Sequence, residues 1–198
     1  MGLDTIRFLF LIEGTMDRDP QVMFQEAWEL AARRVNAGKH SKDRIKFFLK
    51  DGTTKTFDIP PMRDDSMKDD FLKTTLKAIL NHPVEALMLS YEAWFLIDEE
   101  ATDTTDFDLE EYVNKHILPR NHPKWREGVN FYYETVDGII LTSIAEILTI
   151  NKKKRELAEL SKIEAATKSV GRMNHFFQKA REYSMEYRHS VDDIIERN

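Results

Sequence analysis

The spacing of apolar residues first predicts a helix near the N-terminal end of the chain. Asp19 is a suitable N-cap, Pro20 suits the first helical position, and Gly38 suits the end of the helix. Between them, apolar side chains recur every three or four residues, as on one face of a helix. This stripe consists of Phe24, Trp28, Ala31 and Val35.

A second helix is predicted over Ser66–Asn81. Ser66 and Asp69 resemble a capping box, with Asp in place of the usual Glu or Gln, and His82-Pro83 ends the helix. The N-terminal run Leu3–Glu13 fits either a helical stripe or a buried strand, and we interpret it as a short helix that ends near Gly14. The inward positions of the second helix are Met67, Phe71, Thr75 and Ile79.

Two β-hairpins are predicted from Asp-Gly pairs that separate extended runs. Asp-Gly favours the tight turns whose twist matches that of paired strands. The pairs are Asp51-Gly52 and Asp137-Gly138. The flanking strands are Arg44–Lys50 and Thr53–Ile59 in the first hairpin, and Phe131–Val136 and Ile139–Ile147 in the second.

The run Val84–Ile97 is apolar on both of its alternating faces, which is typical of a central strand covered on both sides. From about Lys152 the chain is predicted to be mostly helical, and from Val170 its apolar spacing alternates three and four. This spacing fits either a long helix that packs on the domain or one that mediates dimerisation or partner binding. The expected fold is therefore α+β: a mostly antiparallel sheet of about five strands with helices packed on it and a long C-terminal helix. Residues 1–150 form the domain and residues 151–198 a helical extension.

Charge is concentrated in one segment. The net charge is −6, but the fourteen residues Asp98–Glu111 carry eight acids and no base, so the rest of the chain sums to +2. This distribution makes nucleic acid an unlikely partner and favours a basic protein partner. The acids are Asp98, Glu99, Glu100, Asp103, Asp106, Asp108, Glu110 and Glu111.

Composition narrows the compartment and the chemistry. The chain has no cysteine, which excludes disulfides, thiolate nucleophiles and zinc sites built from cysteine. It shows no signal peptide and no stretch that could span a bilayer, so we expect a soluble cytoplasmic protein. Common nucleotide-binding and hydrolase motifs are missing, and neither a cofactor nor a metal site is expected.

Glu92 is the most informative candidate residue because it is a carboxylate within the apolar run. An unpaired charge in a core is costly, so Glu92 should meet a cation, a donor or water. Arg126-Glu127 opens the strand expected beside it, and we predict that Arg126 pairs with Glu92. With His122 as a base or proton donor, the set Glu92, His122, Arg126 and Glu127 predicts an acid–base site or ligand pocket; a purely structural ion pair that fixes the loop is the alternative.

The same residues carry a resemblance. The strand with Glu92-Ala93-Trp94, the later Pro123-Lys124-Trp125-Arg126-Glu127 and the hairpin at Asp137-Gly138 are similar to an uncharacterised group of bacterial and phage proteins. The similarity covers about Val84–Ile147. It supplies no function, but it implies a recurrent structural or ligand role for the two glutamates and the arginine, and a microbial or viral source.

Two functions follow as hypotheses. The first is a non-catalytic intracellular interaction protein, such as a phage or bacterial accessory factor, which binds a protein partner or itself. The second is a small enzyme or ligand-binding protein that uses the Glu/His/Arg site at the sheet end; the ligand is not indicated. The interaction surface would combine the acidic segment with the C-terminal residues Val170, Met173, Phe177 and Tyr187.

Overall fold

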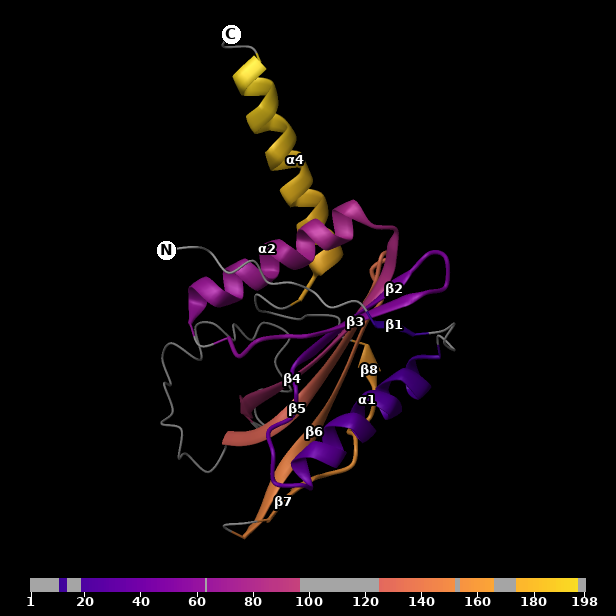
Figure 1. Ribbon diagram of the computed structural model, residues 1–198, viewed down its shortest axis with the longest axis vertical. Coiled ribbons are helices and arrows are strands. Elements are labelled where there is room, and N and C mark those ends of the chain that lie inside the picture. The colour runs from indigo at the N-terminus through magenta and orange to yellow at the C-terminus, as the bar shows by residue number, and fades with distance from the viewer. Residues whose placement is uncertain are drawn as a thin grey trace.

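The computed structural model describes residues 11–13, 19–62, 64–96, 125–151, 154–165 and 174–195 (Figure 1). Within them, three helices accompany a single antiparallel sheet. In chain order the elements are β1 (Leu11–Glu13), α1 (Pro20–Val35), β2 (Arg44–Leu49), β3 (Thr54–Asp58), α2 (Asp65–Asn81), β4 (Val84–Leu96), β5 (Trp125–Thr135), β6 (Ile140–Asn151), β7 (Lys154–Leu157), β8 (Glu164–Ala165) and α4 (Phe176–Ile195).

The sheet follows the order β1-β3-β2-β4-β5-β6-β7, and β8 pairs with β6 as well. The α+β class is therefore confirmed, whereas the expectation of about five strands is wrong. The extra strands come from both ends of the described chain. β4 lies in the middle of the order, as the two apolar faces of its sequence predicted.

The N-terminal strand β1 replaces the short helix expected over Leu3–Glu13, as far as the structure describes that segment. Leu11 lies opposite Thr56 and Glu13 opposite Thr54, so β1 pairs with the outer edge of β3. An apolar run this short fits both helical and strand periods. The unpaired backbone groups of an edge strand decide in favour of the strand.

The segment 154–165 lies along the outer edge of β6 and is not the start of a helical extension. Leu157 is opposite Ile147 and Ala165 is opposite Leu141, so the segment runs antiparallel to β6 over most of its length. Its backbone supplies partners for the N–H and C=O groups of β6. The C-terminal helix α4 begins only at Phe176 and is shorter than predicted.

The predicted hairpins are confirmed. β2 pairs with β3 and β5 with β6, each across an Asp-Gly turn. Gly52 and Gly138 have φ values of 87° and 89°, a backbone region that residues other than glycine rarely adopt.

The ends of α1 are also as predicted. The Asp19 carboxylate accepts a hydrogen bond from the backbone N–H of Gln21, and Pro20 occupies the first turn. Gly38 adopts a φ of 73° just after the helix, where Lys39 N donates to Arg34 O at 3.0 Å.

The start of α2 differs from the prediction by two residues. Asp64 is the N-cap, and its carboxylate accepts from Met67 N at 2.8 Å. Ser66 therefore lies inside the helix, and the capping box proposed for Ser66 and Asp69 is not the cap. An aspartate one or two residues upstream competes equally well for the cap position.

The helices cover opposite faces of the sheet (Figure 1). We call these the α1 face and the α2/α4 face. Because strand side chains alternate, the even-numbered residues of β4 from Ala86 onward lie on the α1 face with Met88, and the odd-numbered ones lie on the α2/α4 face with Leu87 and Leu89. The buried cores on the two faces include Phe24, Val35, Phe48, Val129 and Phe131 on the first, and Ile45, Phe71, Leu87, Tyr132 and Phe176 on the second.

Phe177 was predicted to belong to a partner-binding stripe, and the structure corrects this. Its side chain is buried with Phe176 in the core of the α2/α4 face. At Phe177 the predicted stripe is therefore part of the core, in the helix that packs on α2 and on β5.

Candidate functional site

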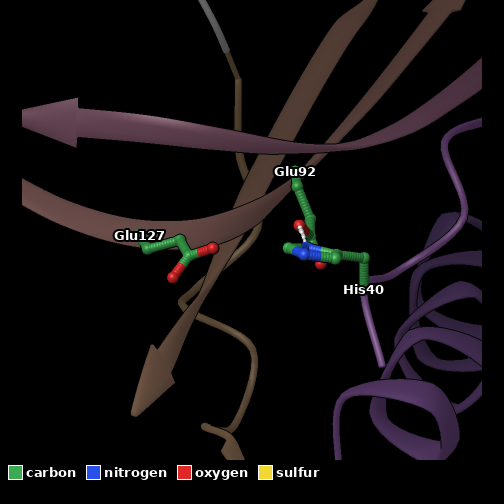
Figure 2. A group of neighbouring side chains, drawn as sticks. All are labelled: His40, Glu92 and Glu127. Carbon is green, nitrogen blue, oxygen red and sulfur yellow. Dashed lines mark hydrogen bonds and ion pairs between the residues drawn. The ribbon is translucent and has the colours of Figure 1, made fainter. Parts of the chain in front are cut away.

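Glu92 lies near the end of β4 on the α1 face, and its side chain is 17% exposed. Both carboxylate oxygens have a partner from the loop that follows α1. Oε1 accepts from the backbone N–H of Ser41 at 2.5 Å, and Oε2 lies 2.7 Å from Nδ1 of His40 (Figure 2). Glu92 thus meets hydrogen-bond donors, as the cost of burying its charge required.

Arg126 does not supply that partner. Directly opposite residues of antiparallel strands share a face, and Arg126 is opposite Phe95, an odd-numbered residue of β4. It therefore lies on the α2/α4 face, where its Nε is 3.3 Å from a carboxylate oxygen of Glu146. The predicted ion pair between Arg126 and Glu92 is wrong because the sheet separates the two side chains.

The loop after α1 supplies the partners of Glu92 that were predicted to be His122 and Arg126. The left-handed turn at Gly38 redirects the chain from α1 toward the end of β4. Arg34 then fixes the loop, since its Nε donates to His40 O at 3.0 Å. The side chain of His40 is 79% exposed, so one ring nitrogen contacts Glu92 and the rest of the ring faces solvent. His40 was not predicted, because 52 residues separate it from Glu92 and no spacing motif connects them.

Glu127 adds a second carboxylate from β5. It is opposite Trp94 in the β4–β5 register and therefore on the α1 face with Glu92. Its Oε1 accepts from a guanidinium nitrogen of Arg155 at 2.5 Å. Arg155 comes from β7, so the edge strand that the sequence did not predict supplies the cation that holds Glu127.

His40, Glu92 and Glu127 form what we call the sheet-end cluster. One nitrogen of the histidine and one oxygen of each carboxylate all lie within 4.8 Å of one another. Figure 2 shows the three side chains converging from the loop after α1, from β4 and from β5. The indole of Trp94 is 52% exposed on the same face and provides an apolar surface next to Glu127. The cluster combines a proton-accepting ring, two anchored carboxylates and access to solvent.

Asp43 connects the cluster to β2. Its Oδ1 accepts from the backbone N–H of Glu92 at 3.0 Å. Burial raises the pKa of Asp43 above its usual value, and the negative charge of Glu92 adds to the rise; the hydrogen bond from Glu92 and the charge of His40 oppose it. The ionised form of Asp43 is thus disfavoured by its surroundings.

A second polar centre lies on the α2/α4 face, around Glu134 of β5. Glu134 is 2% exposed. Its carboxylate accepts hydrogen bonds from Tyr132 OH and Phe176 N at 2.7 Å each and from Phe177 N at 3.1 Å. The tyrosine oxygen accepts in turn from His175 N. Burial, followed by the hydrogen bond to Glu134, raises the pKa of Tyr132. Glu134 therefore caps the first turn of α4 from a neighbouring strand.

Glu134 was not predicted from the sequence. A glutamate at alternate spacing from a tyrosine, in the first strand of the second predicted hairpin, was the available signal. This pattern indicates a buried carboxylate at least as well as the apolar sequence around Glu92 does.

Several predicted site residues lie outside the described residues. These are His122, all eight acids of the 98–111 segment, Val170 and Met173. Tyr187 is in α4, but its side chain is also outside the description. Among the helices that the structure does describe, none is both long enough and apolar enough to cross a bilayer.

Comparison with known proteins gives no match. No protein family, no curated protein and no solved structure is similar to this chain at the significance required.

Proposed function

We propose that the protein binds a small polar ligand at the sheet-end cluster. The observation that carries this proposal is the convergence of His40, Glu92 and Glu127, from three elements, on one point open to solvent. Backbone and arginine contacts hold the two carboxylates in place, which is the preorganisation that a binding site requires.

The ring of His40 gives the site acid–base capacity. A carboxylate only accepts hydrogen bonds, so Nδ1 of His40 carries the proton that Glu92 accepts. In the neutral form of the ring, Nε2 is then a proton acceptor on the exposed side. A ligand with an acidic O–H or N–H group, seated against Trp94, would be within reach of that nitrogen. This arrangement supports the second of the two functional hypotheses, with His40 and Arg155 in place of His122 and Arg126.

Amide NMR of the labelled protein tests the proposal. A panel of sugars, nucleosides, amines, carboxylates, phosphates and divalent metal ions is titrated into the wild-type protein and into His40→Ala. We expect at least one class to shift the amides of Ser41 and Glu92, which lie in the cluster, and the shifts to disappear in the variant. A panel that leaves both amides unmoved, or shifts that persist in His40→Ala, would contradict the proposal.

A protein-interaction role remains a second proposal, supported by the position of α4. α4 packs on α2 and on β5, and Figure 1 shows the helix continuing beyond α2 and away from the sheet. Met185 of α4 is a large apolar side chain that is exposed. For self-association, light scattering of the wild-type protein should give a mass above 23.3 kDa that falls on dilution, and Met185→Glu should favour the monomer. A constant mass of 23.3 kDa would exclude self-association through α4.

A further inference from the structure

We infer that the ligand of the sheet-end cluster is a divalent transition-metal ion, held by His40, Glu92 and Glu127. The inference rests on the proposed function, because it names the ligand of the same site. One imidazole nitrogen and two carboxylate oxygens are a ligand set that zinc and its neighbours in the first transition row accept. The three ligand atoms lie within 4.8 Å of one another, and they come from separate elements of the fold.

The distances need only small side-chain movements to fit an ion. With metal–ligand bonds of about 2.0–2.2 Å, tetrahedral ligand atoms lie about 3.4 Å apart. The Nδ1 of His40 and the Oε2 of Glu92 are now 2.7 Å apart, so an ion would replace their shared proton and separate them by about 0.7 Å. The exposed ring of His40 has room to move. The carboxylate of Glu127 would then have to move toward the other two ligand atoms by at most about 1.4 Å.

Each carboxylate is anchored through one oxygen, and its other oxygen is not used by that anchor. Ser41 N holds Oε1 of Glu92, and Arg155 holds Oε1 of Glu127. Groups that fix the first ligands in this way are a regular feature of metal sites. Both glutamate side chains are mostly buried, in contrast to the freely exposed acids that gather on many protein surfaces without an ion.

The surrounding charges also permit a cation. The carboxyl-terminal end of α1 precedes His40 by a few residues and carries the negative end of the helix dipole. Asp43 adds a third carboxyl group at Glu92, whereas Arg34 and Arg155 offset part of the negative charge. A site with three protein ligands and an open side differs from a calcium site, which needs six to eight oxygens.

Isothermal titration of Zn²⁺ into the full-length wild-type protein tests the inference. We expect one ion per chain at micromolar concentrations and at least about a tenfold weaker affinity in each of His40→Ala and Glu127→Gln. The change at His40 affects an exposed loop side chain, so this variant should keep its fold, which far-UV circular dichroism checks. Mg²⁺ and Ca²⁺ should bind at least about tenfold more weakly than Zn²⁺.

Two matched controls separate the cluster from adventitious sites. His82→Ala removes an exposed histidine after α2, and Glu146→Gln removes the partner of Arg126 on the opposite face of the sheet. Both should bind Zn²⁺ like the wild type. The inference fails if no saturable binding occurs, if His40→Ala and Glu127→Gln bind as well as the wild type, or if Mg²⁺ competes equally.

The outcome can be separated from that of the proposed function. If Zn²⁺ does not bind but an organic ligand shifts the Ser41 and Glu92 amides, the metal inference fails and the binding function stands. If neither Zn²⁺ nor the panel acts on the cluster, both fail.

Discussion

Replacing Glu134 by glutamine should destabilise the protein strongly, because this carboxylate accepts three hydrogen bonds in the core. Two of the donors, Phe176 N and Phe177 N, belong to the backbone at the start of α4 and cannot become acceptors. The third is the hydroxyl of Tyr132. A glutamine amide keeps one oxygen but places an NH₂ group against at least one of these donors.

The magnitude follows from those contacts. A hydrogen bond to a charged group contributes about 1.5–3 kcal/mol, and a buried donor left without a partner costs about 1–3 kcal/mol. Loss of the negative charge at the start of α4 adds about 0.3–1 kcal/mol. Because these contributions overlap, we expect Glu134→Gln to lower the free energy of unfolding by about 3 kcal/mol. For a chain of this length that corresponds to a fall in Tm of about 6–12 °C.

Urea denaturation followed by far-UV circular dichroism measures this change, with exposed Glu159→Gln as the matched control. The control should stay within about 0.5 kcal/mol of the wild type. In Glu134→Gln, hydrogen exchange at the Phe176 and Phe177 amides should be faster than in the wild type. The increase should be larger there than at the amides of α1. If Glu134→Gln also stays within about 0.5 kcal/mol, the cap does not contribute to stability and the reasoning is refuted.

Two further substitutions test the local electrostatics. Burial raises the pKa of Asp43 in the native state above its unfolded value of 3.8. Between these two pKa values the native state binds more protons than the unfolded state, so the free energy of unfolding falls as pH rises. Asp43→Asn, which can still accept from Glu92 N, should therefore be more stable than the wild type at pH 7 and lose that advantage below pH 3.8; an equal difference at both pH values would contradict the shift. Thr54→Val should raise stability by about 1 kcal/mol, since the buried Thr54 hydroxyl has no hydrogen-bond partner in the described part of the chain. The comparison is Thr53→Val, which removes a hydroxyl bonded to Asp51 and should not stabilise; thermal unfolding of both variants decides.

The parts of the fold that the sequence predicted depend on signals within a few residues of each other. Asp19 and Pro20 define the start of α1, and the Asp-Gly turns define both hairpins, because caps and turns are local interactions. β1, β7 and β8 are strands only because an edge elsewhere in the sheet needs partners. Short apolar runs do not contain that information.

The candidate site depends on register, which the sequence did not provide. Arg126 and Glu127 are neighbours in β5, and a shift of one residue decides which of them shares a face with Glu92. The connection between β4 and β5 is long, so no turn motif fixes that register. His40 could not be predicted for a similar reason. Its contact with Glu92 depends on where the loop after α1 lies in the fold, not on the spacing of the two residues in the sequence.

The two buried glutamates show how structural and functional carboxylates can be distinguished. Around Glu134 the donors include two backbone N–H groups, so substitution by glutamine leaves a mismatch that cannot be repaired. Around Glu92 the main side-chain partner is the exposed ring of His40, whose proton can move to the other nitrogen and let Nδ1 accept from a glutamine. Ser41 N keeps its acceptor in either case. Glu92→Gln should therefore lower the free energy of unfolding much less than Glu134→Gln does, while it removes a charged ligand from the sheet-end cluster. A carboxylate whose loss weakens binding but hardly affects folding is one that serves the site.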